Sequence, residues 1–189
     1  MSDAAVDTGV LDFSKLQLPG NSSALRSTNP GNDRLLATDS GQLPFKVVDE
    51  RQAAKYAREF QHCVIDTEAR PEEEDLRALA DGCDLLIIPT TPDALALDAL
   101  MLTVKALDGL RTSGYRILLS IIPPRPSRDG DEARSTLREA GLPLLTQGVR
   151  RLVAFQKAAL AGVPVYAVDD PRANLGWEDY QQVGKEILP

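Results

Sequence analysis

The sequence is poor in the residues that bind transition metals or cross-link chains. It contains one histidine, His62, and two cysteines, Cys63 and Cys83. A zinc site is built from a cluster of such side chains, so we expect none here. Both cysteines lie beside apolar runs, which predicts buried thiols in a reducing compartment.

Long hydrophobic runs are also missing. A membrane-spanning helix needs roughly 18 or more consecutive apolar residues, and no stretch of the sequence approaches that length. The first residues carry Asp3, Asp7 and Asp12 without the basic flank and apolar centre of a signal peptide. We therefore expect a cytoplasmic protein with no membrane partner.

Positive charge is in deficit. The chain has 21 Lys and Arg against 28 Asp and Glu, a formal net charge of -7. An acidic protein does not attract nucleic acid over its whole surface, although a local basic patch is still able to do so. At 189 residues and 43% hydrophobic content, the chain suits one globular domain with an appendage.

The appendage is the first 42 residues, which show no regular periodicity. The stretch from Leu18 to Arg34 is rich in Gly, Asn, Ser and Pro and follows neither a helical nor a strand pattern. Such a composition buries too little apolar surface to offset chain entropy, so we expect residues 1–42 to be a flexible segment. A short strand over Arg34–Thr38 is the one exception considered. The domain proper is expected to span residues 43–189.

From Leu43 onward, strand patterns alternate with helix patterns. We expect strands at Phe45–Val48, His62–Asp66, Asp84–Thr90, Tyr115–Ile122, Pro143–Thr146 and Val163–Val168. We expect helices at Asp49–Phe60, Pro71–Gly82, Leu97–Leu110, Gly130–Gly141, Arg150–Gly162 and Trp177–Leu188. Parallel strands need a crossover element between them. The alternation therefore predicts an α/β fold with a mostly parallel sheet flanked by helices on both faces.

One residue in this pattern raises a functional question. Asp66 ends the apolar strand His62–Asp66, at the edge where open α/β sheets bind their ligands. An aspartate there caps the next helix or begins a turn in many proteins. Alternatively, it is a Walker B-type carboxylate that holds the magnesium ion of a bound nucleotide. The local pattern leaves both interpretations open.

Four stretches of the sequence together resemble a known family. They are Leu43–Pro71, Asp81–Leu100, Arg150–Val165 and Asp170–Leu188. In this order they are similar to the ParA/MinD family of deviant Walker ATPases, on the ParA side, whose members partition plasmids and chromosomes or position cargo on the bacterial nucleoid. The resemblance implies a P-loop NTPase-like fold, with ATP and Mg²⁺ as cofactors. It covers essentially the whole region after residue 42.

The resemblance also assigns residues to a nucleotide site. Asp66 matches the acidic residue that ends the Walker B strand and acts on Mg²⁺ through water. The other nucleotide-binding residues implied by the resemblance lie in loops that follow strands: Thr67, Pro89, Pro124, Asp170 and Pro171. In the family, "DT" is commonly followed by prolines, whereas here Glu68, Ala69 and Arg70 come before Pro71.

Partners are implied in the same way. Arg150, Arg151 and Lys157 lie on one predicted helical run and resemble basic residues that contact the DNA backbone in relatives, with a solvated helix face as the alternative. The family also implies a homodimer or a heterodimer with a full-length relative, weak nonspecific DNA binding, and a cargo adaptor. Localisation would then be cytoplasmic and nucleoid-associated.

The phosphate-binding loop of the family is missing. No G-x-x-x-x-G-K-[ST] motif occurs, and the single Gly-Lys pair, Gly184-Lys185, is followed by Glu186. In that motif main-chain N–H groups, a lysine and a hydroxyl hold the phosphates and Mg²⁺. We therefore expect a truncated homologue, incomplete at the N-terminus, that does not bind or hydrolyse ATP alone. The family's central strand is missing with the motif, which predicts either marginal folding or a substitute strand.

Three functional hypotheses follow. The chain is a truncated partition-type ATPase homologue without activity, or a non-enzymatic regulatory or DNA-binding partner of a full-length relative. The third hypothesis makes it one half of a split ATPase, completed by a separate chain that carries the P-loop. The sequence alone does not choose among them.

Overall fold

The computed structural model describes residues 23–27, 46–49, 62–67 and 73–188. It forms two compact units, and each is described by itself. The first comprises Met1–Arg70 and Val153–Gly184, and the second comprises Pro71–Leu152 and Lys185–Pro189. The predicted strand Arg34–Thr38 and the predicted helix after Asp49 lie outside the described residues.

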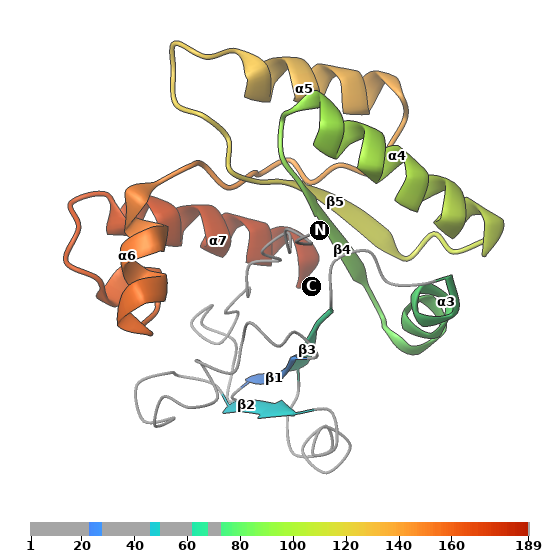
Figure 1. Ribbon diagram of the computed structural model, residues 1–189, viewed down its shortest axis with the longest axis horizontal. Coiled ribbons are helices and arrows are strands. Elements are labelled where there is room, and N and C mark those ends of the chain that lie inside the picture. The colour runs from blue at the N-terminus through green and yellow to red at the C-terminus, as the bar shows by residue number, and fades with distance from the viewer. Residues whose placement is uncertain (1–22, 28–45, 50–61, 68–72, 189) are drawn as a thin grey trace, which may run out of the picture. The chain divides into compact units, whose positions relative to one another are not determined.

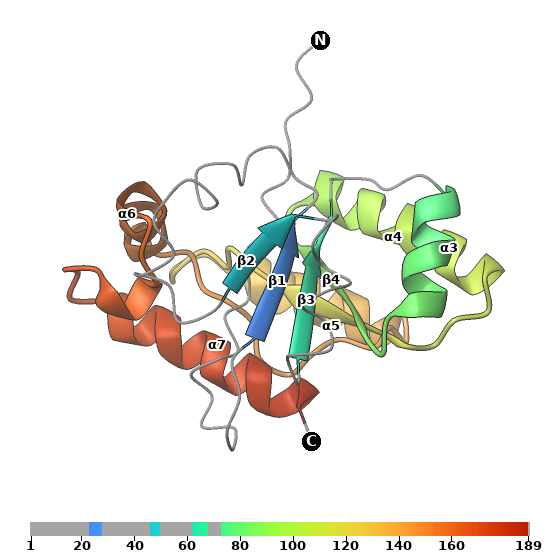
Figure 2. The same cartoon turned by 90° about the horizontal axis from the view of Figure 1, so that it is seen from below.

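The first unit contains a three-stranded parallel sheet. Its strands are β1 (Ser23–Ser27), β2 (Lys46–Asp49) and β3 (His62–Asp66). The strand order is β2-β1-β3, so β1 is central and pairs in parallel with both neighbours (Figure 2). The predicted strand ending at Asp66 is confirmed residue for residue. β2 confirms the predicted Phe45–Val48 strand with a shift of one residue.

β1 lies where the sequence pattern predicted no regular structure. A substitute for the missing central strand was considered at Arg34–Thr38, but the structure places a central strand at Ser23–Ser27. A ladder is made by main-chain N–H and C=O groups, which any residue except proline can supply on both sides. The segment "SALRS" contains neither proline nor glycine. It is therefore able to pair although it lacks the apolar alternation that reveals other strands.

Helices complete the first unit. They are α6 (Val153–Ala161), the short 3₁₀ helix η2 (Val165–Ala167) and the larger part of α7 (Ala173–Ile187). Two edge-to-face aromatic pairs join them. Phe155 of α6 meets Tyr180 of α7 with ring centroids 5.6 Å apart, and Tyr166 of η2 meets Trp177 of α7 at 5.0 Å. Such pairs stabilise by about 0.5–1.5 kcal/mol beyond the area they bury.

The predicted strand Val163–Val168 is wrong, because η2 occupies its centre. Pro164 has no N–H to give to a ladder, and its carbonyl accepts a hydrogen bond from Ala167 N at 2.9 Å, which closes a helical turn. The short apolar run "VPVYAV" suits a buried turn as well as a strand, and periodicity alone does not separate the two.

The second unit is built on a parallel strand pair. β4 (Leu86–Thr90) and β5 (Tyr115–Leu119) pair in the register Leu86 to Tyr115 through Thr90 to Leu119. Three helices belong to this unit: α3 (Glu73–Gly82), α4 (Ala94–Gly109) and α5 (Asp129–Glu139). Every described strand pairing in the protein is parallel, as predicted. The described strands nevertheless form two separate ladders instead of one continuous sheet.

One hydrophobic core holds the second unit together. Leu107 of α4 and Ile117 and Leu119 of β5 have no exposed surface. Leu76 of α3 and Leu137 of α5 join the same cluster, and Figure 1 shows α4 and α5 on one side of β5. Burying a leucine or isoleucine side chain fully contributes about 1.5–3 kcal/mol. This core therefore fixes the positions of β4 and β5 and of the loops that follow them.

Two predictions of burial are wrong. Met101 follows the three- and four-residue apolar spacing of its helix, which predicts a core position, but its side chain is exposed on α4. Cys63 was expected to be buried, whereas it is exposed, and Cys83 is half-buried. Both errors have the same cause. A stripe or strand pattern predicts which side chains share a face but not how far neighbouring elements cover that face.

The segment after α5 runs beside β5 without forming a full strand, so the predicted strand Pro143–Thr146 is reduced to a single bridge at Leu144. Ile117 N donates to Pro143 O, and Leu145 N donates to Ile117 O, both at 2.9 Å. In an uninterrupted parallel ladder, Leu119 O would accept from the amide two residues beyond Leu145. It accepts instead from Val149 N at 2.9 Å.

Two extra residues therefore loop out between these bonds. We call Thr146–Gly148 the bulge. None of the helices within residues 73–188 is long and apolar enough to cross a membrane.

The bulge has no room for a side chain at Gly148. A Cβ atom there would lie 2.7 Å from Leu119 O and 2.6 Å from Ile122 Cδ1. We expect Gly148→Ala to lower the free energy of unfolding by about 1–3 kcal/mol through overpacking. Gly82→Ala is the matched control, because nothing lies within 4 Å of that position. Urea denaturation of both variants checks this, and a Gly148 variant as stable as the control would contradict it.

Candidate functional site at the carboxyl ends of the strands

The carboxyl edge of the first sheet brings three polar residues into one row. Ser27 ends β1 and pairs in register with Asp49, which ends β2, and with Asp66, which ends β3. Ligands of open parallel sheets bind at this edge. Sequence reasoning identified Asp66 and missed the other two. The pattern of an apolar run followed by aspartate also occurs at Asp49 and was a usable signal, whereas nothing in the sequence pointed to Ser27.

Asp66 itself is 7% exposed at the end of β3. The prediction that it lies at the carboxyl end of a strand is confirmed. Thr67, predicted to bind nucleotide, follows it and is half-buried, and residues 68–72 lie outside the described residues. A carboxylate at the end of a parallel strand is suited to a ligand placed at the sheet edge.

A magnesium ion would find one protein carboxylate at Asp66. Mg²⁺ keeps several waters and is held by one or two carboxylates together with nucleotide phosphates. In the part of the chain that the structure describes, no three His, Cys, Asp or Glu side chains gather into a metal cluster. Asp66 therefore fits a water-mediated contact to a nucleotide-bound ion and does not fit an independent metal site.

In the second unit, the carboxyl end of β4 is hydrogen-bonded to the residue that follows β5. Thr90, which follows Pro89, is 5% exposed. Its carbonyl oxygen accepts hydrogen bonds from Ser120 N at 2.8 Å and from Ser120 Oγ at 3.1 Å. These bonds join the loops after β4 and β5, so Pro89, predicted to bind nucleotide, lies directly before this junction.

The loop after β4 begins α4 with a side-chain cap. Asp93 Oδ1 accepts from Ala96 N at 3.0 Å, and Asp93 Oδ2 accepts from Thr91 Oγ1. The hydrogen bond from Thr91, followed by that from Ala96, lowers the pKa of the Asp93 carboxyl, and burial opposes this only in part. The segment Pro89–Leu97, which the family resemblance implies to lie near a dimer interface, thus contains an N-cap, which orients α4.

In the first unit, the structure brings together two predicted site residues that the sequence analysis had placed in different sites. Lys157 Nζ of α6 lies 2.8 Å from Asp170 Oδ2 in the loop before α7. Asp170 Oδ1 also accepts from Arg172 N at 2.9 Å, and Ala173 N donates to the Asp170 carbonyl at 3.0 Å. The predicted DNA-binding lysine and the predicted nucleotide-binding aspartate therefore neutralise one another. The neighbouring Pro171 is exposed.

The other two predicted DNA-binding residues are not on a helix with Lys157, which corrects that prediction. α6 begins at Val153, whereas Arg150 forms a bridge with Ile122 and Arg151 N donates to Ile122 O at 2.8 Å. Because both arginines pair with the segment after β5 in an extended conformation, α6 begins only after them. Pro124, predicted near a bound base, is exposed in the loop after β5.

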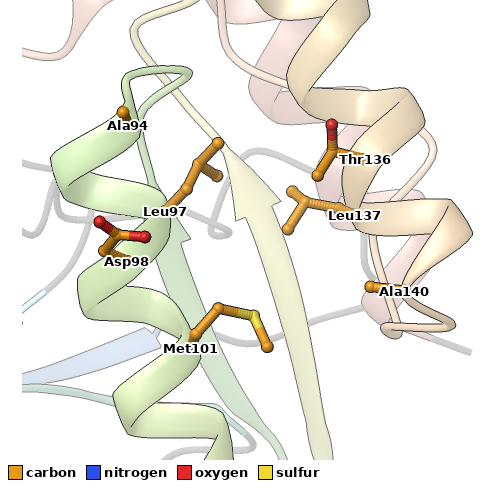
Figure 3. Close-up of a pocket in the computed structure, with 7 residues that line it drawn as sticks. All are labelled: Ala94, Leu97, Asp98, Met101, Thr136, Leu137 and Ala140. Carbon is orange, nitrogen blue, oxygen red and sulfur yellow. The ribbon is translucent and has the colours of Figure 1, made fainter.

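A shallow apolar cavity lies elsewhere in the second unit, between α4 and α5 (Figure 3). Its volume is about 270 Å³. Leu97 and Met101 of α4 face Leu137 and Ala140 of α5, and the carboxylate of Asp98 is the charged group in its lining. Such a lining suits apolar groups and repels phosphate, so this cavity is not a candidate nucleotide site.

The Lys157–Asp170 pair makes stability depend on pH. The hydrogen bond from Lys157, then that from Arg172 N, lowers the pKa of the Asp170 carboxyl in the folded protein. Stabilisation from a depressed carboxyl pKa is complete above the unfolded value, about 3.9, and is lost as pH falls through the lower folded value. We expect the difference in unfolding free energy between the wild type and Asp170→Asn to be constant from about pH 7 to 5 and to shrink below about pH 4.

Denaturation of both proteins across this range measures the difference. Asp169→Asn changes the adjacent exposed residue and serves as the control. A difference that persists unchanged at low pH would assign the effect to packing rather than to charge.

Comparisons with known proteins give the chain two relatives and a structural counterpart. No family model matches it. Maintenance of carboxysome distribution protein A from Gloeobacter kilaueensis is 32% identical over 124 residues, which are 66% of this chain and 57% of that protein. The protein of the same name from Halothiobacillus neapolitanus is 25% identical over 111 residues, 57% of this chain and 50% of that one. The chain thus spans about half the length of these relatives.

The fold has a solved counterpart. The crystal structure of a ParA family ATPase from Chlorobium tepidum TLS matches with a TM-score of 0.66, at 14% identity, over 94% of this chain and 91% of that chain. This match shows similarity of fold, whereas the two relatives above are similar in sequence. The resemblance predicted from sequence is confirmed at both levels. The chain has the ParA family ATPase fold and is a homologue of the maintenance of carboxysome distribution proteins.

Proposed function

We propose that this chain acts in a ParA-like system that positions cargo on the bacterial nucleoid, and that it neither binds nor hydrolyses ATP by itself. One observation carries the proposal. The chain aligns over 124 residues with a carboxysome distribution protein, yet its sequence contains no G-x-x-x-x-G-K-[ST] motif. It keeps the body of a positioning protein without the phosphate-binding loop.

Physical chemistry supports the second half of the proposal. Binding a triphosphate depends on converging main-chain N–H groups, a lysine and a metal-bound hydroxyl. Asp66 at the end of β3 supplies one carboxylate, which contacts phosphate only through a metal ion. The predicted pocket residue Asp170 is engaged by Lys157 and by Arg172 N. ATP and Mg²⁺ then act in this system through another chain.

The partner that we infer is a full-length ParA-like relative, with which this chain forms a mixed dimer as a regulatory or DNA-binding subunit. A complete P-loop-type sheet, flanked by helices on both faces, would form the nucleotide half of that dimer. A chain that supplies only the P-loop would serve the same purpose in a split ATPase. A cargo adaptor, of the kind that ParA-like proteins use, completes the assembly in the cytoplasm.

The first test is calorimetric titration of the 189-residue chain with Mg-ATP. We expect no binding in the micromolar range, which corresponds to about -8 kcal/mol, because the phosphate cradle is missing. Asp66→Ala is expected to leave the titration unchanged. Micromolar affinity abolished by that substitution would contradict the proposal and reveal a phosphate site of another kind.

The second test concerns DNA. Nonspecific binding grows with the number of phosphates neutralised and falls steeply with salt. Because the chain carries a net charge of -7, we expect binding to be weak at physiological salt and detectable at low salt. Arg151→Ala should weaken the low-salt binding more than Lys157→Ala, because Lys157 is already paired with Asp170.

Mobility shifts at two salt concentrations, with and without a full-length relative, measure both effects. The relative is expected to restore binding at physiological salt by forming the mixed dimer. Tight and salt-resistant binding by the chain alone would refute the need for a partner and make it an independent DNA-binding module.

A further inference from the structure

The bulge Thr146–Gly148 presents two main-chain donors to one acidic side chain. Thr146 N donates to Glu186 Oε2 at 2.7 Å, and Gln147 N donates to Glu186 Oε1 at 2.6 Å. Each carboxylate oxygen therefore receives its own N–H. These distances lie at the short end of the range for charge-assisted hydrogen bonds. Consecutive N–H groups that converge in this way form a nest, which is a recurrent arrangement for binding anions.

Arg134 of α5 supports the bulge from its other side. Its Nη1 atom donates to Thr146 O at 2.7 Å and to Leu145 O at 3.3 Å. The carbonyl groups of Leu145 and Thr146 thus bind a cation, while the amides of Thr146 and Gln147 bind an anion. Burial and the neighbouring Arg138 lower the pKa of Arg134, and Asp131 and Glu186 raise it. An arginine remains charged in proteins, so its field favours an anion beside the bulge.

The ladder explains why Thr146 N and Gln147 N do not pair with β5. Leu145 N and Val149 N bond to carbonyls of β5. Of the three residues between them, Thr146 and Gln147 donate their N–H groups to Glu186 instead. Gly148 can approach Leu119 O and Ile122 closely because it has no side chain. The ladder bonds on either side and the close packing of Gly148 therefore hold the backbone of the bulge in place from the β5 side.

We propose that the bulge is an oxyanion-binding site that the chain fills with its own Glu186, and that phosphate binds there when the last turn of α7 is released. The ligand class is a small anion with two oxygens able to meet neighbouring amides, namely phosphate or a carboxylate. Glu186 is exposed and stands in the last turn of α7, so a modest displacement of that turn vacates the site. The contact makes the end of α7 sensitive to anions.

Mass action sets the expected magnitudes. A side chain on the same molecule acts at an effective concentration of millimolar or more, so free phosphate at a few millimolar competes poorly in the wild type. Removing the internal carboxylate removes this competition. We therefore expect Glu186→Ala to lower the dissociation constant for inorganic phosphate by at least about tenfold.

The test is a titration of ¹⁵N-labelled full chain with sodium phosphate, followed by the amide resonances of Thr146 and Gln147 in NMR spectra. Sodium chloride at equal ionic strength is the reference, and sodium acetate distinguishes a carboxylate ligand from phosphate. Glu178→Ala is the matched control, because it removes an exposed glutamate from the same helix and leaves the bulge occupied. Glu186→Gln keeps the size of the side chain and provides a second variant if the alanine variant does not fold.

Saturable phosphate shifts of these two amides in Glu186→Ala, absent from the wild type and from Glu178→Ala, would support the proposal. In Glu186→Gln, an intermediate response is expected, because the amide oxygen satisfies one N–H and leaves the other. Equal and weak shifts in all proteins would mean an adventitious ion only and would overturn it. A lack of response in both Glu186 variants would overturn it as well, and would make Glu186 a purely structural contact.

Discussion

Main-chain pairing along both edges of β1 is the interaction on which the first unit depends. Within the described residues, β2 and β3 each pair with β1 and with no other strand. A buried amide or carbonyl that loses its partner costs about 1–3 kcal/mol, so loss of a five-residue central strand would remove most of what orders this sheet. The row of Ser27, Asp49 and Asp66 exists only because β1 holds its neighbours in register.

The dependence of this sheet on main-chain groups explains what the sequence could and could not predict. His62–Asp66 carries an apolar strand pattern and was predicted with correct bounds. β1 carries no pattern, because pairing through the backbone leaves no signature in "SALRS". The helices of the second unit were predicted from their apolar spacing and from their start and stop residues, with ends correct to within a few residues. Predictions failed at Val163–Val168 and Pro143–Thr146, where short apolar runs form a turn and a broken ladder.

For the site, the sequence predicted where Asp66 lies in the fold but did not predict which side chains contact one another. Asp66 was located from its position after a strand, but the pairing of Lys157 with Asp170 joins residues 13 positions apart and follows only from how α6 and α7 approach one another. Arg134 likewise makes its contacts within the chain, to the carbonyl oxygens of Leu145 and Thr146.

The pair of Tyr166 and Trp177 in the first unit determines what fluorescence can report about the protein. Trp177 is the single tryptophan of the chain, and its ring lies 5.0 Å from that of Tyr166 in an edge-to-face contact. Tryptophan emission therefore originates entirely in the unit that contains α6, η2 and most of α7. The second unit contains the buried Tyr115 but no tryptophan. It therefore gives no emission when tryptophan alone is excited. Tryptophan fluorescence therefore reports on the unfolding of the first unit and not directly on that of the second.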